Sequence, residues 1–170
     1  MIRAASFLTV LGALAVLASP AQAAEQRLLG TFGHWSAYSF LENGNKVCYM
    51  AAKPQKAQGN YSSRGDIFAL ITHRPAEGSK NVFSYATGYS YRANSEATVN
   101  IGGRKFSLFT QDDMAWAPDP AQDNALAEAI RTGNNMVVTG TSARGTLTTD
   151  TFSLSGSSKA YEIITKECGL

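Results

Sequence analysis

Hydrophobic and polar residues alternate along most of this chain, with turn-forming residues between the alternating runs. The runs 34–42 and 45–52 flank Asn43-Gly44. That dipeptide between two such runs predicts a β-hairpin, because both turn positions need a positive φ. A second hairpin is predicted over 98–110, turning at Gly102-Gly103.

The other alternating or apolar runs predict further strands. Residues 66–73 are apolar on both faces, which indicates a central buried strand. Residues 53–65 are rich in Gly, Ser, Lys and Gln and predict a loop. Additional strands are expected at 81–88, 135–140 and 146–154.

One internal segment has helical spacing. Asp119 can cap a helix with Pro120 at its first position, and Gly133 ends it. The expected apolar stripe of this helix comprises Ala125, Leu126, Ala129 and Ile130.

The C-terminal segment also predicts a helix, starting at Ser157. Ala160, Ile164 and Cys168 stand at i, i+4 and i+8, with Tyr161 beside them, so they share its inward face. The predicted fold class is therefore mainly β: a single-domain, β-sandwich-like core with two short α-helices, one at the C-terminus.

The N-terminus has the pattern of a secretory signal peptide. In residues 1–23, Arg3 precedes an apolar run over 4–18, and Pro20 and Ala21-Gln22-Ala23 supply a helix break and a small-x-small cleavage pattern. The run is shorter than the roughly 20 apolar residues of a membrane-spanning helix.

We therefore expect residues 24–170 to form one exported β domain without a transmembrane segment. The expected location is periplasmic, or else cell-surface-associated or secreted. The 15 Lys and Arg residues nearly balance the 13 Asp and Glu residues, and no basic cluster occurs. This balance argues against a nucleic-acid partner, whose footprint is a basic stripe.

Export changes the interpretation of the two cysteines, Cys48 and Cys168. In an oxidising compartment two thiols most simply form one disulfide, which would tie the C-terminal tail to the core. A redox-active or metal-binding pair fits poorly, because there is no C-x-x-C and only His34 and His73 could assist. We expect no metal and no cofactor.

The sequence offers no constellation for catalysis. A Ser-His-Asp arrangement would need His34 or His73, and Ser142 lies in G-T-S-A-R-G rather than in a nucleophile elbow. A hydrogen-bonded position at the end of a strand is the expected role of His73. We therefore expect a protein that is not an enzyme.

Two features are candidates for interaction. Arg64-Gly65-Asp66 matches a tripeptide that integrins recognise, but Ser-x-Arg-Gly recurs at 142–145 without an adhesive motif. The recurrence favours a structural turn entering a strand, in which glycine adopts a conformation unfavourable to other residues. Tyr85, Tyr89 and Tyr91 form the second candidate, either as a contact surface or as core packing.

Ten short motifs follow one another along the chain: G-x-F-G-x-W (30–35), K-V-C-Y-M-A-A-K-P (46–54), R-G-D-I (64–67), I-T-H-R-P (71–75), G-Y-S-Y (88–91), F-x-L-F-T (106–110), A-W-A-P-D (115–119), G-T-S-A-R-G-T (140–146), T-D-T-F-S-L-S-G (149–156) and A-Y-x-x-I-x-x-x-C (160–168). This ordered series resembles the invasion-associated locus B (IalB) family of exported bacterial proteins, over essentially all of residues 24–170. Many members of that family carry a cysteine shortly after the tryptophan of the first motif, whereas this chain has Tyr38 in that region.

The resemblance implies a periplasmic or surface-exposed protein linked to host-cell invasion, with no catalytic residues to transfer. We expect a non-enzymatic envelope protein that promotes invasion or persistence by binding an envelope or host protein or glycan. The alternative is a housekeeping periplasmic protein that binds a small molecule, glycan or envelope partner and has no direct host role. Both stay open here, because both need only a stable exported β domain.

Overall fold

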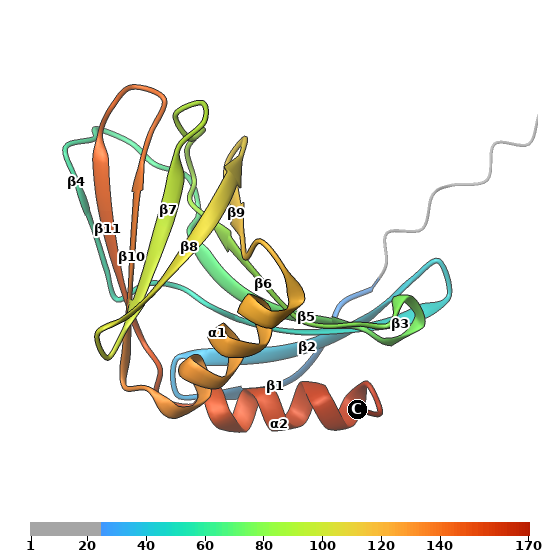
Figure 1. Cartoon of the computed structure of the whole chain (residues 1–170). Helices are drawn as coiled ribbons and strands as arrows, with labels where there is room; N and C mark the ends of the chain where they lie inside the picture. The colour runs from blue at the N-terminus through green and yellow to red at the C-terminus, as the bar shows by residue number, and fades with distance from the viewer. Residues whose placement is uncertain (1–24) are drawn as a thin grey trace, which may run out of the picture.

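A computed structural model describes residues 25–170, so the predicted signal peptide lies outside the described residues. Within them, eleven strands form one antiparallel sheet in the order β1-β2-β3-β5-β6-β9-β8-β7-β10-β11-β4 (Figure 1). The strands are β1 (Arg27–Phe32), β2 (Trp35–Glu42), β3 (Asn45–Ala52), β4 (Lys56–Gly59), β5 (Phe68–Arg74), β6 (Ser79–Ala86), β7 (Glu96–Ile101), β8 (Arg104–Gln111), β9 (Met114–Trp116), β10 (Asn135–Thr141) and β11 (Leu147–Ser153).

The sheet bends so that the buried faces of its two halves meet. Tyr85 of β6 packs edge-to-face on Phe152 of β11, with ring centroids 6.2 Å apart. The Trp35 indole N–H of β2 donates to the Ser153 carbonyl of β11 at 3.1 Å. The result is a mainly-β, sandwich-like core, which confirms the predicted fold class.

Two α-helices and one short 3₁₀ turn, η1 (Pro75–Glu77), complete the described residues. Helix α1 (Pro120–Thr132) packs against β6 and against α2 (Ser157–Glu167), and α2 also covers β1, β2 and β3 (Figure 1). Asp119 caps α1 as predicted, accepting from the Gln122 N–H at 2.8 Å. Neither helix, nor any other in residues 25–170, is long and apolar enough to cross a membrane.

The two predicted hairpins are confirmed by their turns. Asn43 and Gly44 both have positive φ, 51° and 80°, and join β2 to β3. Gly102 and Gly103 join β7 to β8 with φ of 58° and 87°. These are the backbone conformations that right-twisted strands need in a two-residue turn.

Three strands were not predicted: β1, β4 and β9. β4 lies inside the segment 53–65 that the sequence analysis assigned to a loop, so that assignment is wrong for residues 56–59. All four β4 residues are exposed and show no apolar alternation. The strand forms because β11 offers it a hydrogen-bonding edge, which is a tertiary effect.

The two cysteines form a disulfide between β3 and the end of α2. The Cα atoms of Cys48 and Cys168 are 6.0 Å apart and 120 positions apart in sequence. His73 of β5 pairs with Cys48 in the sheet register and lies buried beneath α2. The predicted link between the C-terminal tail and the core is present.

His73 has the strand-end, hydrogen-bonded position that was expected. Its Nδ1 accepts from the Asn81 N–H at 3.0 Å, and its Nε2 lies 3.3 Å from the Thr165 hydroxyl. Because burial disfavours the charged ring, the pKa of His73 falls to about 4. The residue is therefore a neutral structural element at physiological pH.

Candidate functional site: a buried arginine beneath a polar cavity

Arg64 lies in the irregular segment between β4 and β5, yet its side chain is only 4% exposed. It points into the sandwich and meets Asp150 of β11, whose side chain is fully buried. The two guanidinium nitrogens Nη1 and Nη2 donate to the two Asp150 carboxylate oxygens at 2.8 and 2.6 Å. This two-point geometry is the strongest arrangement for an arginine–carboxylate pair.

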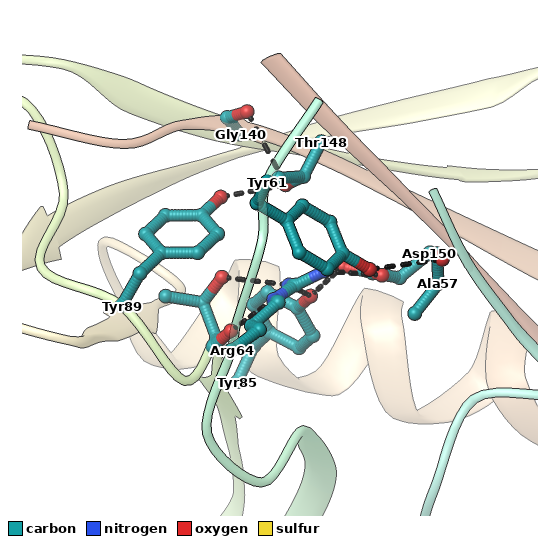
Figure 2. Close-up of polar contacts among 9 residues, drawn as sticks. Ala57, Tyr61, Arg64, Tyr85, Tyr89, Gly140, Thr148 and Asp150 are labelled. Carbon is teal, nitrogen blue, oxygen red and sulfur yellow. Dashed lines mark hydrogen bonds and ion pairs between the residues drawn. The ribbon is translucent and has the colours of Figure 1, made fainter. Parts of the chain in front are cut away.

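The remaining donors of Arg64 reach the end of β6. Nε donates to the Thr87 carbonyl at 2.6 Å, and Nη2 lies 3.0 Å from the Thr87 hydroxyl and 3.2 Å from the Tyr85 hydroxyl. Tyr85 in turn donates to Asp150 (Figure 2). We call Arg64, Asp150, Tyr85 and Thr87 the Arg64 cluster. Because it joins β6 to β11, it clamps the two halves of the sheet together.

The positive charge of Arg64 is balanced within the cluster. Burial alone would lower the pKa of the Arg64 guanidinium, but the hydrogen bonds and charge of Asp150 outweigh burial and raise it. Burial, together with the neighbouring Asp150 carboxylate, raises the pKa of the Tyr85 phenol well above its usual range. Tyr85 is therefore a neutral donor, and Arg64 is a cation compensated by one buried anion.

Two tyrosine rings flank the buried guanidinium. The Arg64 Cζ lies 4.9 Å from the ring centroid of Tyr89 and 5.5 Å from that of Tyr61. The Tyr89 hydroxyl is 2.6 Å from the Thr148 hydroxyl, and Tyr61 donates to the Ala57 carbonyl at 2.9 Å (Figure 2). Cation–π contacts of this kind hold the rings and the arginine in one fixed arrangement.

This placement bears on the Arg64-Gly65-Asp66 tripeptide. The Asp66 side chain is 74% exposed and pairs with Lys53 at 2.9 Å, whereas the Arg64 side chain is buried. An adhesive motif requires an accessible arginine, and the loop predicted at 53–65 would expose Arg64, but the structure buries its side chain. The tripeptide does not present its two charges together to a partner.

The proposed role of Gly65 also needs correction. Gly65 does not have a positive φ. Its N–H donates to the Gly88 carbonyl at 2.9 Å, and a Cβ on it would lie 3.3 Å from the Gly88 oxygen. The strained position is Gly88, with φ of 74°, where a Cβ would lie 2.5 Å from the Gly65 oxygen. Position 65 favours glycine because the Gly88 backbone packs closely against it, not because the backbone has a positive φ.

The second Ser-x-Arg-Gly segment does form a turn. Residues 142–145 connect β10 to β11, and the Gly145 N–H donates to the Ser142 carbonyl at 2.8 Å. Gly145 has φ of 86°, the conformation that glycine adopts at least cost. Arg144 is exposed on this turn and has no ion-pair partner within residues 25–170.

The segment 88–92 holds the two Ser-x-Arg-Gly segments side by side. Its Gly88 carbonyl binds Gly65, and its Ser90 carbonyl accepts from the Ala143 N–H at 2.8 Å. Figure 1 shows the segment after β4, the connection from β6 to β7 and the β10–β11 turn gathered at one end of the sheet. Segments 80 residues apart in sequence therefore line one site.

A cavity of about 480 Å³ lies between these three segments, directly over the Arg64 cluster. Eight of its lining residues carry a hydroxyl group, two more are arginines, and none is acidic. The volume is that of a small-ligand site. The lining residues are Asn60, Tyr61, Ser62, Ser63, Arg64, Tyr89, Ser90, Ser142, Ala143, Arg144, Thr146 and Thr148.

The three tyrosines of the predicted aromatic cluster have different places. Tyr85 and Tyr91 are buried, at 1% and 7% exposure, and belong to the core. Tyr89 alone lines the cavity. The contact-surface hypothesis is therefore wrong for Tyr85 and Tyr91, and the packing interpretation holds for them.

Asp150, Tyr61 and the cavity itself were not predicted from the sequence. The position of Asp150 could have been inferred from strand alternation. In the run T-L-T-T-D-T-F, Asp150 shares a strand face with Phe152, so its carboxylate faces the core. A charge in such a position needs a buried partner of opposite sign. The sequence did not identify that partner, because Arg64 is 86 positions away.

Other chemistry is sparse at this site. Neither histidine lines the cavity, and His34 bonds the Gln55 side chain at 3.1 Å. Within residues 25–170, no three His, Cys, Asp or Glu side chains gather into a group that could hold a metal ion. The site is thus a polar cavity whose lining includes an ion-paired arginine.

The fold places the protein in the mainly-β class, and its candidate site is a polar cavity at one end of the sheet. A family model described as "Invasion associated locus B (IalB) protein" matches residues 35–165, so the chain belongs to the IalB family. No protein with a curated description matches it.

A solved structure shares the fold. It is the crystal structure of invasion associated protein b from Bartonella henselae, with 17% sequence identity and a TM-score of 0.56. The match covers 81% of this chain and 95% of that chain. At this identity the likeness supports the fold and carries no residue roles.

Proposed function

We propose that this protein is an exported, non-enzymatic protein of the bacterial envelope that promotes host-cell invasion or persistence by binding a partner in the cavity at Arg64. The observation that carries the proposal is the cavity of about 480 Å³ over a rigid buried cluster. Its size lies in the range of small-ligand sites. Family membership supports the envelope and invasion context.

The rigidity of the Arg64 cluster at the base of the cavity supports a binding role. Arg64 is fixed by five hydrogen bonds to three residues and by two aromatic rings, so the cavity is shaped before a ligand arrives. A pre-organised site loses little conformational entropy on binding. The lining has no imidazole, thiol, amine or free carboxylate to act as a general base, which favours binding over catalysis.

The alternative is a periplasmic protein that binds a small polar molecule or glycan without a direct host role. The concave shape of the site favours this alternative over binding to a flat protein surface. The disulfide between Cys48 and Cys168 is compatible with either location, because both are oxidising. Protease treatment of intact cells separates them: complete protection supports the periplasmic alternative, and cleavage supports the surface role.

A cavity-filling variant tests the proposed site. Ser90 is exposed in the lining, and only its backbone carbonyl is used in the fold, so Ser90→Trp should fill the cavity without unfolding the protein. Ser158→Trp, on the exposed face of α2, is the matched control. Purified proteins are tested for binding to host cells and to isolated envelopes. Loss of binding in Ser90→Trp alone supports the proposal, and equal binding by both variants contradicts it.

A further inference from the structure

The lining of the cavity is unbalanced in hydrogen-bonding groups and in charge. It contains two arginines and no acid, and the one buried acid nearby, Asp150, is already used by Arg64. The charge of Arg64 is therefore compensated, whereas that of Arg144 is not. A ligand that complements this site must bring a negative charge to Arg144.

A second guanidinium, that of Arg92, lies close to the turn that carries Arg144. The Arg92 Nη2 lies 3.0 Å from the position that a Cβ on Gly145 would occupy, next to the turn that carries Arg144. Arg92 is exposed and, like Arg144, has no ion-pair partner within residues 25–170. Two uncompensated cations near this turn create a positive potential there, which attracts an anion.

Other residues of the lining suit a different part of a ligand. Ser62, Ser63 and Ser90 contribute hydroxyl groups to the lining. Tyr61, 36% exposed, and Tyr89 supply aromatic carbon beside these hydroxyls. A sugar ring has the matching chemistry, because its hydroxyl rim needs hydrogen bonds while its C–H face needs apolar contact.

We propose that the cavity binds an acidic sugar, a pyranose ring that carries a carboxylate. The carboxylate pairs with Arg144, with Arg92 adding to the local positive charge. The ring lies against Tyr61 and Tyr89, and its hydroxyls bond the serine side chains. The volume of about 480 Å³ accommodates one or two such rings. This inference rests on the proposed function, since it names the ligand class of the same site.

Calorimetric titration with a panel of methyl glycosides tests the inference. Methyl glucuronide, methyl galacturonide and methyl N-acetylneuraminide carry the carboxylate, while methyl glucoside and methyl galactoside do not. Acetate and inorganic phosphate are anions without the ring. We expect at least one acidic sugar to bind about tenfold or more tightly than its neutral counterpart and than either simple anion. We also expect its affinity to fall as salt is raised from about 0.1 to about 1 M.

Arg144→Gln should remove the preference for the acidic sugar while leaving weak binding of the neutral ring. Arg104→Gln is the matched control, because Arg104 is an exposed arginine at the β7–β8 turn, at the other end of β7 from the cavity. A preference retained in Arg144→Gln overturns the assignment of the carboxylate contact.

Three other outcomes overturn the ligand class. Equal binding of neutral and acidic sugars excludes the charge requirement, equal binding of acetate or phosphate excludes the ring, and no binding by any acidic sugar excludes the class. None of these results affects the Ser90→Trp experiment on cells and envelopes. If that variant loses binding while every acidic sugar fails, the proposed function stands and the ligand class is wrong.

Discussion

The two Ser-x-Arg-Gly segments have the same sequence pattern, line the same cavity and use their arginines in opposite ways. Arg64 is 4% exposed and bonded at two points to Asp150, whereas Arg144 is exposed on a hairpin turn. Their glycines differ as well, since Gly145 has a positive φ and Gly65 does not. The tetrapeptide pattern therefore determines neither backbone conformation nor role.

The difference arises from what each segment faces. Arg64 follows an edge strand that pairs with β11, and this brings it to a core-facing carboxylate on that strand. Arg144 is held at the rim by the 88–92 segment, where no carboxylate lines the cavity. A buried partner converts an arginine into part of the core, and its absence at the rim leaves an arginine that can contact a ligand.

Removal of the buried partner should have the largest effect. Asp150→Asn leaves the Arg64 cation buried without compensation, and we expect it to lower the free energy of unfolding by about 3–5 kcal/mol. Denaturant unfolding measures the change. Asp113→Asn, an exposed carboxylate, is the control and should change stability by less than about 0.5 kcal/mol.

Similar small losses of stability in Asp150→Asn and Asp113→Asn would contradict the conclusion that the Arg64 cluster holds the two halves of the sheet together. A double variant, Arg64→Met with Asp150→Leu, gives a second check. We expect it to recover much of the stability lost in Asp150→Asn, because no unpaired charge remains.

The disulfide is a second long-range link, and it should act independently of both arginines. Replacing Cys48 and Cys168 by alanine should cost about 2–4 kcal/mol, because the unfolded chain loses a covalent constraint across 120 positions. Melting temperature with and without reductant measures this effect. An unchanged melting temperature on reduction, or two free thiols in the exported protein, would show that the link does not exist.

Alanine substitutions at Gly145 and Gly65 should distinguish backbone strain at a turn from close packing. Gly145→Ala forces a side chain into a positive φ and should cost about 1 kcal/mol. Gly102→Ala is its control, since that site has φ of 58° and open space around it, and should cost about the same. Gly65→Ala meets only the Gly88 backbone at 3.3 Å and should cost about half as much. A larger loss for Gly65→Ala than for Gly145→Ala would reverse this interpretation.

The smallest effect is expected at Asp66. Its side chain is 74% exposed and its pair with Lys53 lies at the surface, where such pairs contribute about 0–1 kcal/mol. Asp66→Glu should change neither the melting temperature nor binding to host cells, because the tripeptide is not displayed as a unit. Loss of adhesion in a folded Asp66→Glu protein would restore the tripeptide as a functional motif.

Local signals predicted the parts of the fold that are determined locally. Asn43-Gly44 and Gly102-Gly103 turn because of their own backbone preferences, and Asp119-Pro120 starts a helix by capping its first turn. The pairing of Cys48 with Cys168 was predicted from the expected oxidising compartment and from the inward face of the C-terminal helix that carries Cys168. By contrast, β4 has no pattern of its own and exists because β11 offers an edge.

The candidate site was harder to predict, for the same reason. Arg64, Tyr89 and Arg144 come from three separate segments, and only the folded sheet brings them to one cavity. Asp150 on a core-facing position indicated that a buried cation exists, but not which of the arginines or lysines supplies it.

The most direct test of this account compares two matched variants, Arg64→Gln and Arg144→Gln, by denaturant unfolding under the same conditions. Each removes one cation from the same tetrapeptide pattern beside the same cavity. We predict a loss of about 3–5 kcal/mol, or failure to fold, for Arg64→Gln, because it leaves the Asp150 carboxylate buried and unpaired. We predict a change of less than about 0.5 kcal/mol for Arg144→Gln, because its side chain is exposed and unpaired within the described residues. Equal losses in the two variants would contradict the division into one structural and one ligand-facing arginine.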